Sequence, residues 1–243
     1  MSSRDKILGR IRMALNAVPG PADLPTEPLV WPVKNIPMSE KRRQFQESLA
    51  AAGGEIVDCS SREDAAQRIA SLLKTLDAKK IGIAHRKIVT ETLACDNAFA
   101  DNASGFERCY APAVAGDVSQ QEVATFDASV IGAEYLLADT GSAIVVSATA
   151  FDRMLCYLPP VCCVVATERM LHEHLPAAWL EICARIKGET VESYDIDANV
   201  PITQHGEFLI VTGPSRTADI EKILVMGVHG PKRLLVFLIA DVA

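Results

Sequence analysis

Short apolar runs alternate with helical segments of about ten residues from residue 39 to the end of this chain. The runs at residues 81–84, 161–167 and 234–239 have the length of strands, not of helices. Strands that are separated by helices usually pair in parallel, and the helices then cover the faces of the sheet. The pattern therefore predicts an α/β fold with a mainly parallel sheet and helices on both faces.

Capping and turn residues set the expected element boundaries. Ser61, with Asp64 three residues later, is typical of a helix N-terminus, and Gly53-Gly54 is typical of a helix end. The expected helices cover residues 39–52, 61–76, 89–93, 119–126, 177–187 and 217–226. The expected strands cover residues 55–58, 81–84, 106–110, 135–138, 143–147, 161–167, 207–212 and 234–239.

Residues 1–38 form a different region, which we interpret as an arm in front of a domain at residues 39–243. Ile7, Leu8, Ile11 and Leu15 share one face of an expected amphipathic helix, and five prolines follow between residues 19 and 32. Such a basic helix could bind an anionic membrane. We favour docking on the chain's own domain or on a neighbouring subunit, which includes a homo-oligomer.

The charge balance argues against nucleic acid as a partner. The chain has 24 Lys and Arg against 31 Asp and Glu, a net charge of −7, and only 5% aromatic residues. An acidic surface repels the phosphate backbone, and few aromatics leave little to stack on bases. The chain also lacks an apolar run of about 18 residues and an N-terminal apolar segment. We therefore expect no membrane insertion and a cytoplasmic protein.

The seven cysteines do not have the spacing of a metal site. None forms a C-x-x-C pair, and the odd count argues against a set of disulfides. We expect reduced thiols, no bound metal and no iron–sulfur cluster in this chain.

The stretch G-P-S-R-T-A-D-I-E at residues 213–221 is the most informative motif. It follows an apolar strand and precedes apolar positions at helical spacing. A helix that starts here would aim free N–H groups and its positive dipole end at the turn, where an arginine adds charge. The sequence thus indicates a site for a small carboxylate or phosphate, although an ordinary capped turn explains the same residues. The candidates are Gly213, Ser215, Arg216 and Thr217, with Asp219 as a weaker one.

His229 lies in a glycine-rich loop after that expected helix. Ten helical residues rise about 15 Å, so the helix would return the chain to the opposite edge of the sheet. Ligands of such sheets usually bind at the carboxyl edge. We therefore expect a structural or interface role for His229, unless a second subunit brings it to the site.

The turn at residues 139–142 is a second candidate. Thr140, Gly141 and Ser142 offer hydroxyls and backbone donors that could form the lip of a ligand site, with Asp139 as a weaker candidate. Glu134 could serve as a carboxylate base or nucleophile. The alternative is a plain hairpin turn with one solvated glutamate.

Together these stretches resemble the lactate-utilisation protein C family, within the group of LUD-domain proteins. The resemblance rests on A-D-T-G-S at residues 138–142, L-P-P at 158–160, the motif at 213–221 and G-V-H-G-P at 227–231. It covers nearly the whole chain, including the basic helix and the proline-rich arm. Where such proteins tend to have a histidine after L-P-P-V, this chain has Cys162, which weakens any role for a side chain at that position.

The resemblance implies a three-layer sandwich like that of the NagB, RpiA and CoA-transferase group. It also implies a three-protein system that oxidises L-lactate to pyruvate, in which the companion proteins carry the iron–sulfur clusters. Our first hypothesis is a subunit without a cluster that binds a small anion and docks on these partners. The alternatives are a free-standing enzyme similar to a CoA transferase or a cyclo-ligase, and a regulatory sensor of small carboxylates.

Overall fold

A computed structural model describes residues 3–17, 32–99, 105–110, 119–147, 149–186, 207–218, 224–227 and 230–240. The chain divides into two compact units, Met1–Pro32 and Val33–Ala243. The first unit contains helix α1 (Ser3–Ala17), on which Ile7 and Met13 are exposed. The domain boundary that we expect after residue 38 stays a prediction.

The second unit is built on a six-stranded sheet with the strand order β1-β12-β7-β4-β2-β3, and neighbouring strands are parallel throughout. The central strands β4, β7 and β12 are buried almost end to end, as expected when both faces of a sheet are covered. This confirms the α/β fold with a mainly parallel sheet. The strands are β1 (Glu55–Cys59), β2 (Lys80–Ile83), β3 (Glu107–Tyr110), β4 (Ala128–Gly132), β7 (Val161–Thr167) and β12 (Arg233–Ile239).

A second sheet has four strands in the order β8-β5-β6-β9. The pairs β5–β6 and β6–β9 are antiparallel, whereas β5 and β8 are parallel. The sequence indicates the β5–β6 pair but not that it belongs to a separate sheet. The strands are β5 (Tyr135–Leu137), β6 (Ser142–Ser147), β8 (Leu171–His172) and β9 (Glu207–Val211).

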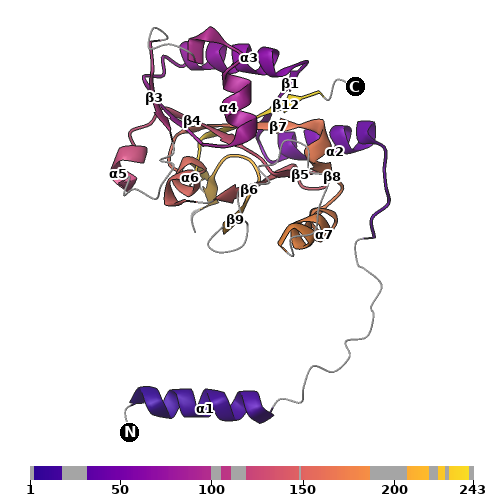
Figure 1. The fold of residues 1–243 in the computed structure, drawn as a ribbon, viewed down its shortest axis with the longest axis vertical. Coiled ribbons are helices and arrows are strands. Elements are labelled where there is room, and N and C mark those ends of the chain that lie inside the picture. The colour runs from indigo at the N-terminus through magenta and orange to yellow at the C-terminus, as the bar shows by residue number, and fades with distance from the viewer. Residues whose placement is uncertain are drawn as a thin grey trace. The chain divides into compact units, whose positions relative to one another are not determined.

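Helices cover the six-stranded sheet on one face, and the second sheet lies on the other (Figure 1). Helices α3 and α4 lie over the first face, whereas α6 lies on the side of β6 and β9. Helix α2 contacts both β1 and β8, so it joins the two sheets. Within the described residues, no helix is long and apolar enough to cross a bilayer. The helices are α2 (Met38–Ala51), α3 (Arg62–Thr75), α4 (Lys87–Leu93), α5 (Gln120–Val123), α6 (Ala150–Leu155) and α7 (Leu175–Ile186).

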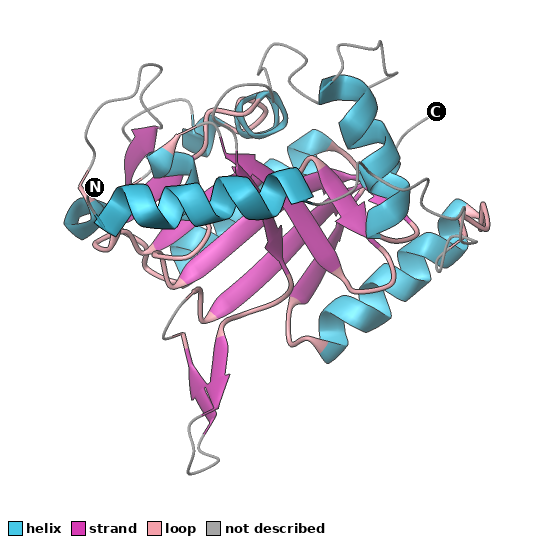
Figure 2. Cartoon of the chain, turned by 90° about the horizontal axis from the view of Figure 1, so that it is seen from below, coloured by secondary structure: helices cyan, strands magenta, loops and turns pink. Residues whose placement is uncertain are grey.

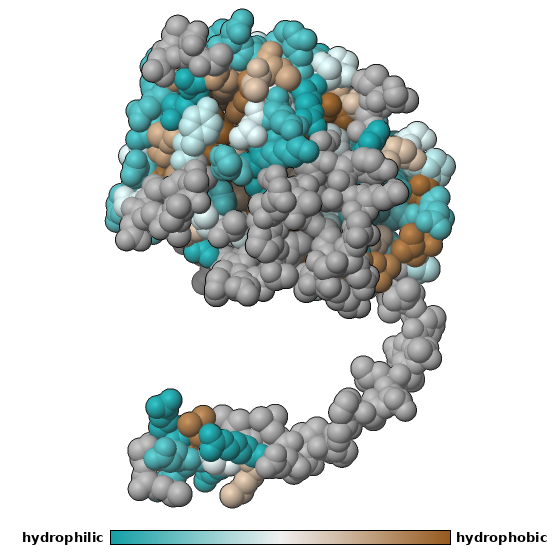
Figure 3. All heavy atoms as spheres, viewed as in Figure 1, coloured by the Kyte–Doolittle hydropathy of each residue, from teal (hydrophilic) through white to brown (hydrophobic). Residues whose placement is uncertain are grey.

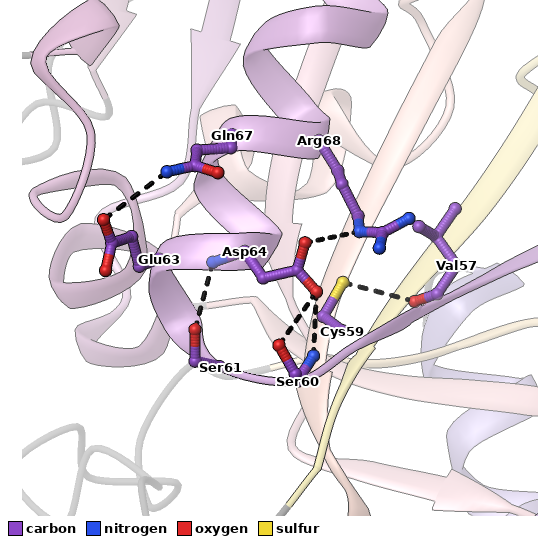
Figure 4. A network of polar contacts seen from close by, with 8 residues as sticks. All are labelled: Val57, Cys59, Ser60, Ser61, Glu63, Asp64, Gln67 and Arg68. Carbon is purple, nitrogen blue, oxygen red and sulfur yellow. Dashed lines mark hydrogen bonds and ion pairs between the residues drawn. The ribbon is translucent and has the colours of Figure 1, made fainter.

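The start of α3 shows how local sequence fixes a boundary (Figure 4). The hydroxyl of Ser61 accepts a hydrogen bond from the N–H of Asp64 at 3.1 Å, as the capping pattern predicts. The Asp64 carboxylate accepts from the N–H of Ser60 at 2.9 Å and from Arg68 at 2.6 Å. The hydrogen bond from Arg68 is the main cause of the lowered pKa of Asp64. The first turn of α3 is therefore fixed by two hydrogen bonds, one from its own N–H to Ser61 and one from the N–H of Ser60 to the Asp64 carboxylate.

Helix α7 packs on the second sheet and leaves apolar side chains exposed. Tyr135 and Ile144 of the sheet form a small core with this helix, separate from the main core. Leu180 of the helix is 65% exposed, and Trp179 is 46% exposed although its ring packs edge-on against Phe208 of β9. Figure 3 shows hydrophobic residues at the lower right of the domain, where α7 lies in Figure 1. Exposed aromatic and aliphatic side chains of this kind are common in protein interfaces.

The segment in front of α2 is held by a buried carboxylate. Glu173 is 6% exposed and accepts hydrogen bonds from the N–H groups of Lys34 at 2.7 Å and Ile36 at 2.9 Å. Burial acts to raise the pKa of Glu173, but these two donors, together with Lys41 and His174, more than offset it and lower the pKa. The chain at residues 34–36 is thus fixed within the second unit, beside the end of β8.

His172 lies in β8 and is a partly buried base. Its ring packs edge-on against Tyr135 with the centroids 5.2 Å apart, and its Nε2 lies 3.5 Å from Oε2 of Glu181. Burial lowers the pKa of His172 to about 4, and Lys41 acts in the same direction. At neutral pH the contact with Glu181 therefore joins a neutral ring to the acidic side chain.

We expect acidification to destabilise the protein through His172. The histidine of the unfolded chain titrates near pH 6.5, whereas the folded ring stays neutral down to about pH 4. The unfolded state therefore binds the extra proton first, and the free energy of unfolding falls by up to roughly 3 kcal/mol as the pH falls through this window. Urea unfolding at several pH values measures the effect. His172→Gln should give a flatter profile, and equal slopes for both proteins would contradict the prediction.

Candidate functional site

The two C-terminal motifs meet in one loop structure. The N–H of Ser215 donates to the carbonyl of Pro231 at 2.9 Å, and the N–H of Gly227 donates to the carbonyl of Ser215 at 2.9 Å. A Cβ on Gly230 would lie 3.0 Å from Cβ of Ser215. Strands β10 (Arg216–Ala218) and β11 (Leu224–Met226) pair antiparallel directly beyond these contacts. The residues on either side of the G-V-H-G-P loop therefore lie beside the G-P-S-R turn.

The helix expected at residues 217–226 is wrong, because the described parts of this stretch form the ribbon β10–β11. In Figure 2 the two-stranded sheet stands apart from the larger sheets. Without this helix, there is no reason to expect His229 at the opposite edge of the sheet. The antiparallel ribbon instead brings the chain at Met226 back beside Arg216. The backbone of Arg216 and Thr217 lies in β10, so no helix dipole supports the anion site. Asp219 and His229 lie outside the described residues.

The L-P-P motif joins the same structure through its last carbonyl. The carbonyl of Pro160 accepts hydrogen bonds from the N–H groups of Lys232 at 2.8 Å and Arg233 at 3.1 Å. Pro160 directly precedes β7, whereas Lys232 directly precedes and Arg233 begins β12, its parallel neighbour. The motifs thus gather at the amino ends of the parallel strands, not at the carboxyl edge where ligands of such sheets usually bind.

The turn between β5 and β6 reaches this region through a chain of hydroxyls. Oγ of Ser142 lies 2.8 Å from Oγ1 of Thr140 and 2.6 Å from Oγ1 of Thr212. Thr212 directly follows β9, whose Val211 pairs with Ala143. The β6–β9 pairing therefore brings the A-D-T-G-S turn against the residue that precedes G-P-S-R.

Two of the candidate glycines are required for packing against α2. Gly141 has φ +65°, and a Cβ there would lie 2.2 Å from the backbone nitrogen of Leu49. Gly213 has φ +80°, and a Cβ there would lie 2.7 Å from the carbonyl oxygen of Ala52. Both turns can sit against the end of α2 only without a side chain. Ser48 adds a hydrogen bond from its hydroxyl to the carbonyl of Asp139 at 3.1 Å.

A cavity of about 390 Å³ opens between the end of β9, the G-P-S-R turn, the loop before β12 and the residues that follow α6. This volume is within the usual range for a small-molecule site. Gly213 and Ser215 line it, as the anion-site prediction requires, but the Ser215 N–H is already bonded to Pro231. The other lining residues, which the sequence analysis does not single out as site residues, are Cys156, Tyr157, Leu209, Ile210, Val211, Thr212, Pro214, Gly230 and Pro231.

Cationic residues follow the lining segments directly in the chain. Arg216 comes after Ser215, and Lys232 and Arg233 come after Pro231. Arg233 is held by Glu55 in a two-point ion pair at 2.8 and 2.9 Å, whereas Lys232 is exposed. Neither Lys232 nor Arg233 is among the residues that line the cavity.

Glu134 lies apart from the cavity. It follows β4, is 2% exposed and forms an ion pair with Arg86, which follows β2 and is 6% exposed. The pair lies at the carboxyl ends of these two strands, and the N–H of Glu134 donates to the carbonyl of Ile144 at 2.7 Å. A nucleophilic carboxylate must reach its substrate, so this burial favours a structural role. Asp139 is exposed at the far end of β5.

Of the buried cysteines, Cys156 lines the cavity and Cys162 does not. Cys162 is fully buried in β7, and burial raises its pKa to about 12. Cys156 lines the cavity, and burial raises its pKa well above the usual value, so both are thiols at neutral pH. In the part of the chain that the structure describes, no group of three or more His, Cys, Asp or Glu side chains is placed to hold a metal ion.

Comparison with known proteins gives a match over most of the chain. A family model described as the LUD domain matches residues 42–239. The uncharacterized protein NMB1437 of Neisseria meningitidis serogroup B is 32% identical over 114 residues, which cover 46% of this chain and 42% of that protein. The uncharacterized protein YkgG of Escherichia coli is 31% identical over 127 residues, which cover 52% of this chain and 49% of that protein. The chain thus spans about half the length of these curated relatives or less.

A solved structure supports the fold. The crystal structure of a DUF162 family protein from Deinococcus radiodurans superimposes with a TM-score of 0.51 at 17% sequence identity. The similarity covers 84% of this chain and 99% of that one. At this identity the likeness concerns the fold alone.

Proposed function

Because the chain belongs to the LUD-domain family, we propose that it is a subunit of a lactate-oxidising system. In this proposal the chain carries no redox centre, binds a small carboxylate at the cavity and docks on partner proteins that hold iron–sulfur clusters. The observation that carries the proposal is the family match over residues 42–239, which includes all four motifs, two of which line the cavity. Gly213 and Ser215, two of the residues predicted to bind a small anion, line the cavity and support this part of the proposal.

Helix α7 supports the docking part of the proposal. Leu180 is exposed and Trp179 is partly exposed, and large apolar side chains of this kind contribute strongly to protein interfaces. A partner that covers them would remove apolar area from water, which stabilises a complex by about 25 cal/mol per Å² before the costs of association.

We expect the chain to co-purify with the products of neighbouring genes that have paired cysteine-rich cluster motifs. The assembly should contain iron and oxidise L-lactate, whereas the chain alone should contain less than about one iron or zinc per molecule, because its cysteine spacing suits neither. Metal analysis and a lactate-oxidation assay on both samples measure this. Stoichiometric iron in the isolated chain, or partners that never co-purify, would contradict the proposal.

Charge substitution on α7 tests the docking face in the same assay. Leu180→Glu places a charge in the expected interface and should weaken co-purification, while the isolated chain remains folded. Tyr110→Glu is the matched control, because Tyr110 is also exposed, at 48%, but lies on the edge strand β3. Equal recovery of partners with both variants would place the interface elsewhere.

A further inference from the structure

Strand β9 lies at an edge of the second sheet and is paired on one side only. Among the described strands, β6 is its neighbour and β9 is the last in the order of the sheet. Among the described residues, no backbone hydrogen bond beyond the pairing with β6 involves Glu207–Val211. The N–H and C=O groups on the second side of β9 can therefore accept a further strand.

The cavity of about 390 Å³ lies along this second side of β9. It is lined by four consecutive residues, from Leu209 to Thr212. Side chains alternate between the two faces of a strand, so a cavity on one face would touch every second residue. Val211 packs against the main core, like Leu209, whereas Ile210 is 51% exposed and pairs with Ile144 of the small core. A space that touches all four residues must border the backbone at the edge.

The composition of the lining indicates what the cavity can hold. Cys156 and Tyr157, which follow α6, complete the lining together with Gly230 and Pro231 before β12 and the turn after β9. None of the lining residues is Asp, Glu, Lys, Arg or His. A charged group that entered this space would lose water without gaining an ionic partner, so the middle of the occupant must be uncharged. The volume suits one short segment and not a second folded domain.

A lysine lies beside one end of the cavity. The N–H of Gly227 donates to the carbonyl of Ser215, which lines the cavity beyond the carboxyl end of β9. A Cβ on Gly227 would lie 2.4 Å from Cγ of Lys232, so the lysine stem passes close to this point, and Lys232 is exposed. Complementary charge at this end favours an acidic group on the occupant, outside the uncharged cavity.

We propose that the free edge of β9 binds an extended peptide segment of another protein as an additional strand. The segment has an uncharged, apolar middle and an acidic amino-terminal residue beside Lys232. The antiparallel direction is favoured because it forms the more stable ladder, and it places the amino end of the peptide at the carboxyl end of β9. Main-chain hydrogen bonds supply the affinity, and Ile210 and Tyr157 select alternate side chains.

This inference goes beyond the proposed function and does not depend on lactate oxidation. A bound segment fills the cavity, so it would exclude a small carboxylate from the same space. The exposed Ile210 then gains the cross-strand neighbour that an apolar residue on an edge strand otherwise lacks.

Calorimetric titration of the full chain with short peptides tests the proposal. The acetylated and amidated peptide of sequence ETVIVT should bind with a Kd below about 1 mM. The control peptide ETPIPT keeps the charge but lacks two backbone N–H groups, because proline has none, and it should bind at least about tenfold more weakly. Hydrogen exchange of the amides at residues 207–211 should slow with ETVIVT and not with ETPIPT.

Two variants of the chain locate the contact. Ile210→Lys places a charge on the edge strand, a device that natural proteins use against strand addition, and should weaken binding of ETVIVT at least about tenfold. Tyr110→Lys is the matched control, because Tyr110 is 48% exposed and ends β3, an edge strand of the other sheet. It should leave the affinity unchanged. Lys232→Glu should weaken binding of ETVIVT by about threefold and strengthen binding of KTVIVT by a similar factor.

Several results would overturn the strand addition. They are equal affinities for ETVIVT and ETPIPT, no binding of either peptide up to about 1 mM, and slowed exchange elsewhere than in β9. A second copy of this chain on the same edge would appear in light scattering as a dimer that Ile210→Lys dissociates and ETVIVT does not. That result also overturns the proposal. None of these results affects the proposed function, because co-purification and the lactate-oxidation assay measure it independently.

Discussion

Replacing Gly141 with alanine should lower the free energy of unfolding by about 4 kcal/mol. The new Cβ would lie 2.2 Å from the backbone nitrogen and 2.5 Å from Cα of Leu49, and neither atom belongs to a side chain that could turn away. Relief requires α2 to move off the turn, at a cost typical of overpacking, about 1–3 kcal/mol. The φ of +65° adds about 1 kcal/mol or more for a residue with a side chain.

Gly105→Ala is the matched control for this experiment. Gly105 has φ +82°, but a Cβ there would meet no atom within 4 Å. It should cost only about 1 kcal/mol, from the backbone conformation alone. Urea unfolding of both variants measures the loss in free energy of unfolding. The difference between the two losses is the cost of the clash with α2, because both variants share the cost of the backbone conformation. Equal losses in the two would show that α2 does not pack on the turn as tightly as these distances require.

Replacing Glu134 with alanine is expected to lower the free energy of unfolding by about as much as Gly141→Ala does. Glu134→Ala leaves the guanidinium of Arg86 buried without its carboxylate, and breaking a buried ion pair in this way costs about 3–5 kcal/mol. The matched control is Glu55→Ala, which breaks the half-exposed pair with Arg233 and should cost less than about 1 kcal/mol. The free energy of unfolding from denaturant titration measures both.

A double variant shows whether the charge or the packing matters at this position. Arg86→Met combined with Glu134→Leu replaces the pair by apolar side chains and should recover most of the stability lost in Glu134→Ala. The result also bears on the alternative function as a free-standing enzyme. If Glu134→Ala is as stable as the wild-type chain, the carboxylate is not structural, and a role as a nucleophile regains support.

The parts of the fold that depend on local sequence were predictable. The helix N-terminus at Ser61 and the helix end at Gly53-Gly54 are set by capping groups a few residues away, and both are confirmed. The parallel sheet followed from apolar runs of strand length, although the expected strands did not include its central strand β4. The second sheet could not be foreseen, because β8 and β9 come from distant parts of the chain and no local signal says which strands they join.

The ribbon β10–β11 shows where periodicity misleads. Ile220, Ile223 and Leu224 have helical spacing, whereas the pairing observed at Thr217 and Val225 matches β-branched residues in strands. Short segments of this kind are decided by contacts distant in sequence, here the bonds that join Ser215 to Gly227 and Pro231.

The candidate site was predictable only in its separate parts. The motif residues were recognised, but the hydrogen bond between Ser142 and Thr212 spans 70 positions in the chain and has no local signature. Thr212 directly precedes the motif that begins at Gly213, and this position in the sequence could have marked it as a site residue. Arg86 was missed because a single arginine gives no sign of the carboxylate that it will meet.

The strand order also has a consequence for synthesis on the ribosome. β1 lies at an edge of the sheet and pairs with β12, and the register joins Glu55 to Leu235, 180 positions later. At typical translation rates of about 5–20 residues per second, roughly 10–40 s pass between the synthesis of these two strands. During that time the nascent chain presents β1 without its neighbour, and the sheet can close only when the last strand leaves the exit tunnel. The sheet is therefore expected to reach its full width only after β12 has been synthesised, and until then β1 is exposed to unwanted pairing.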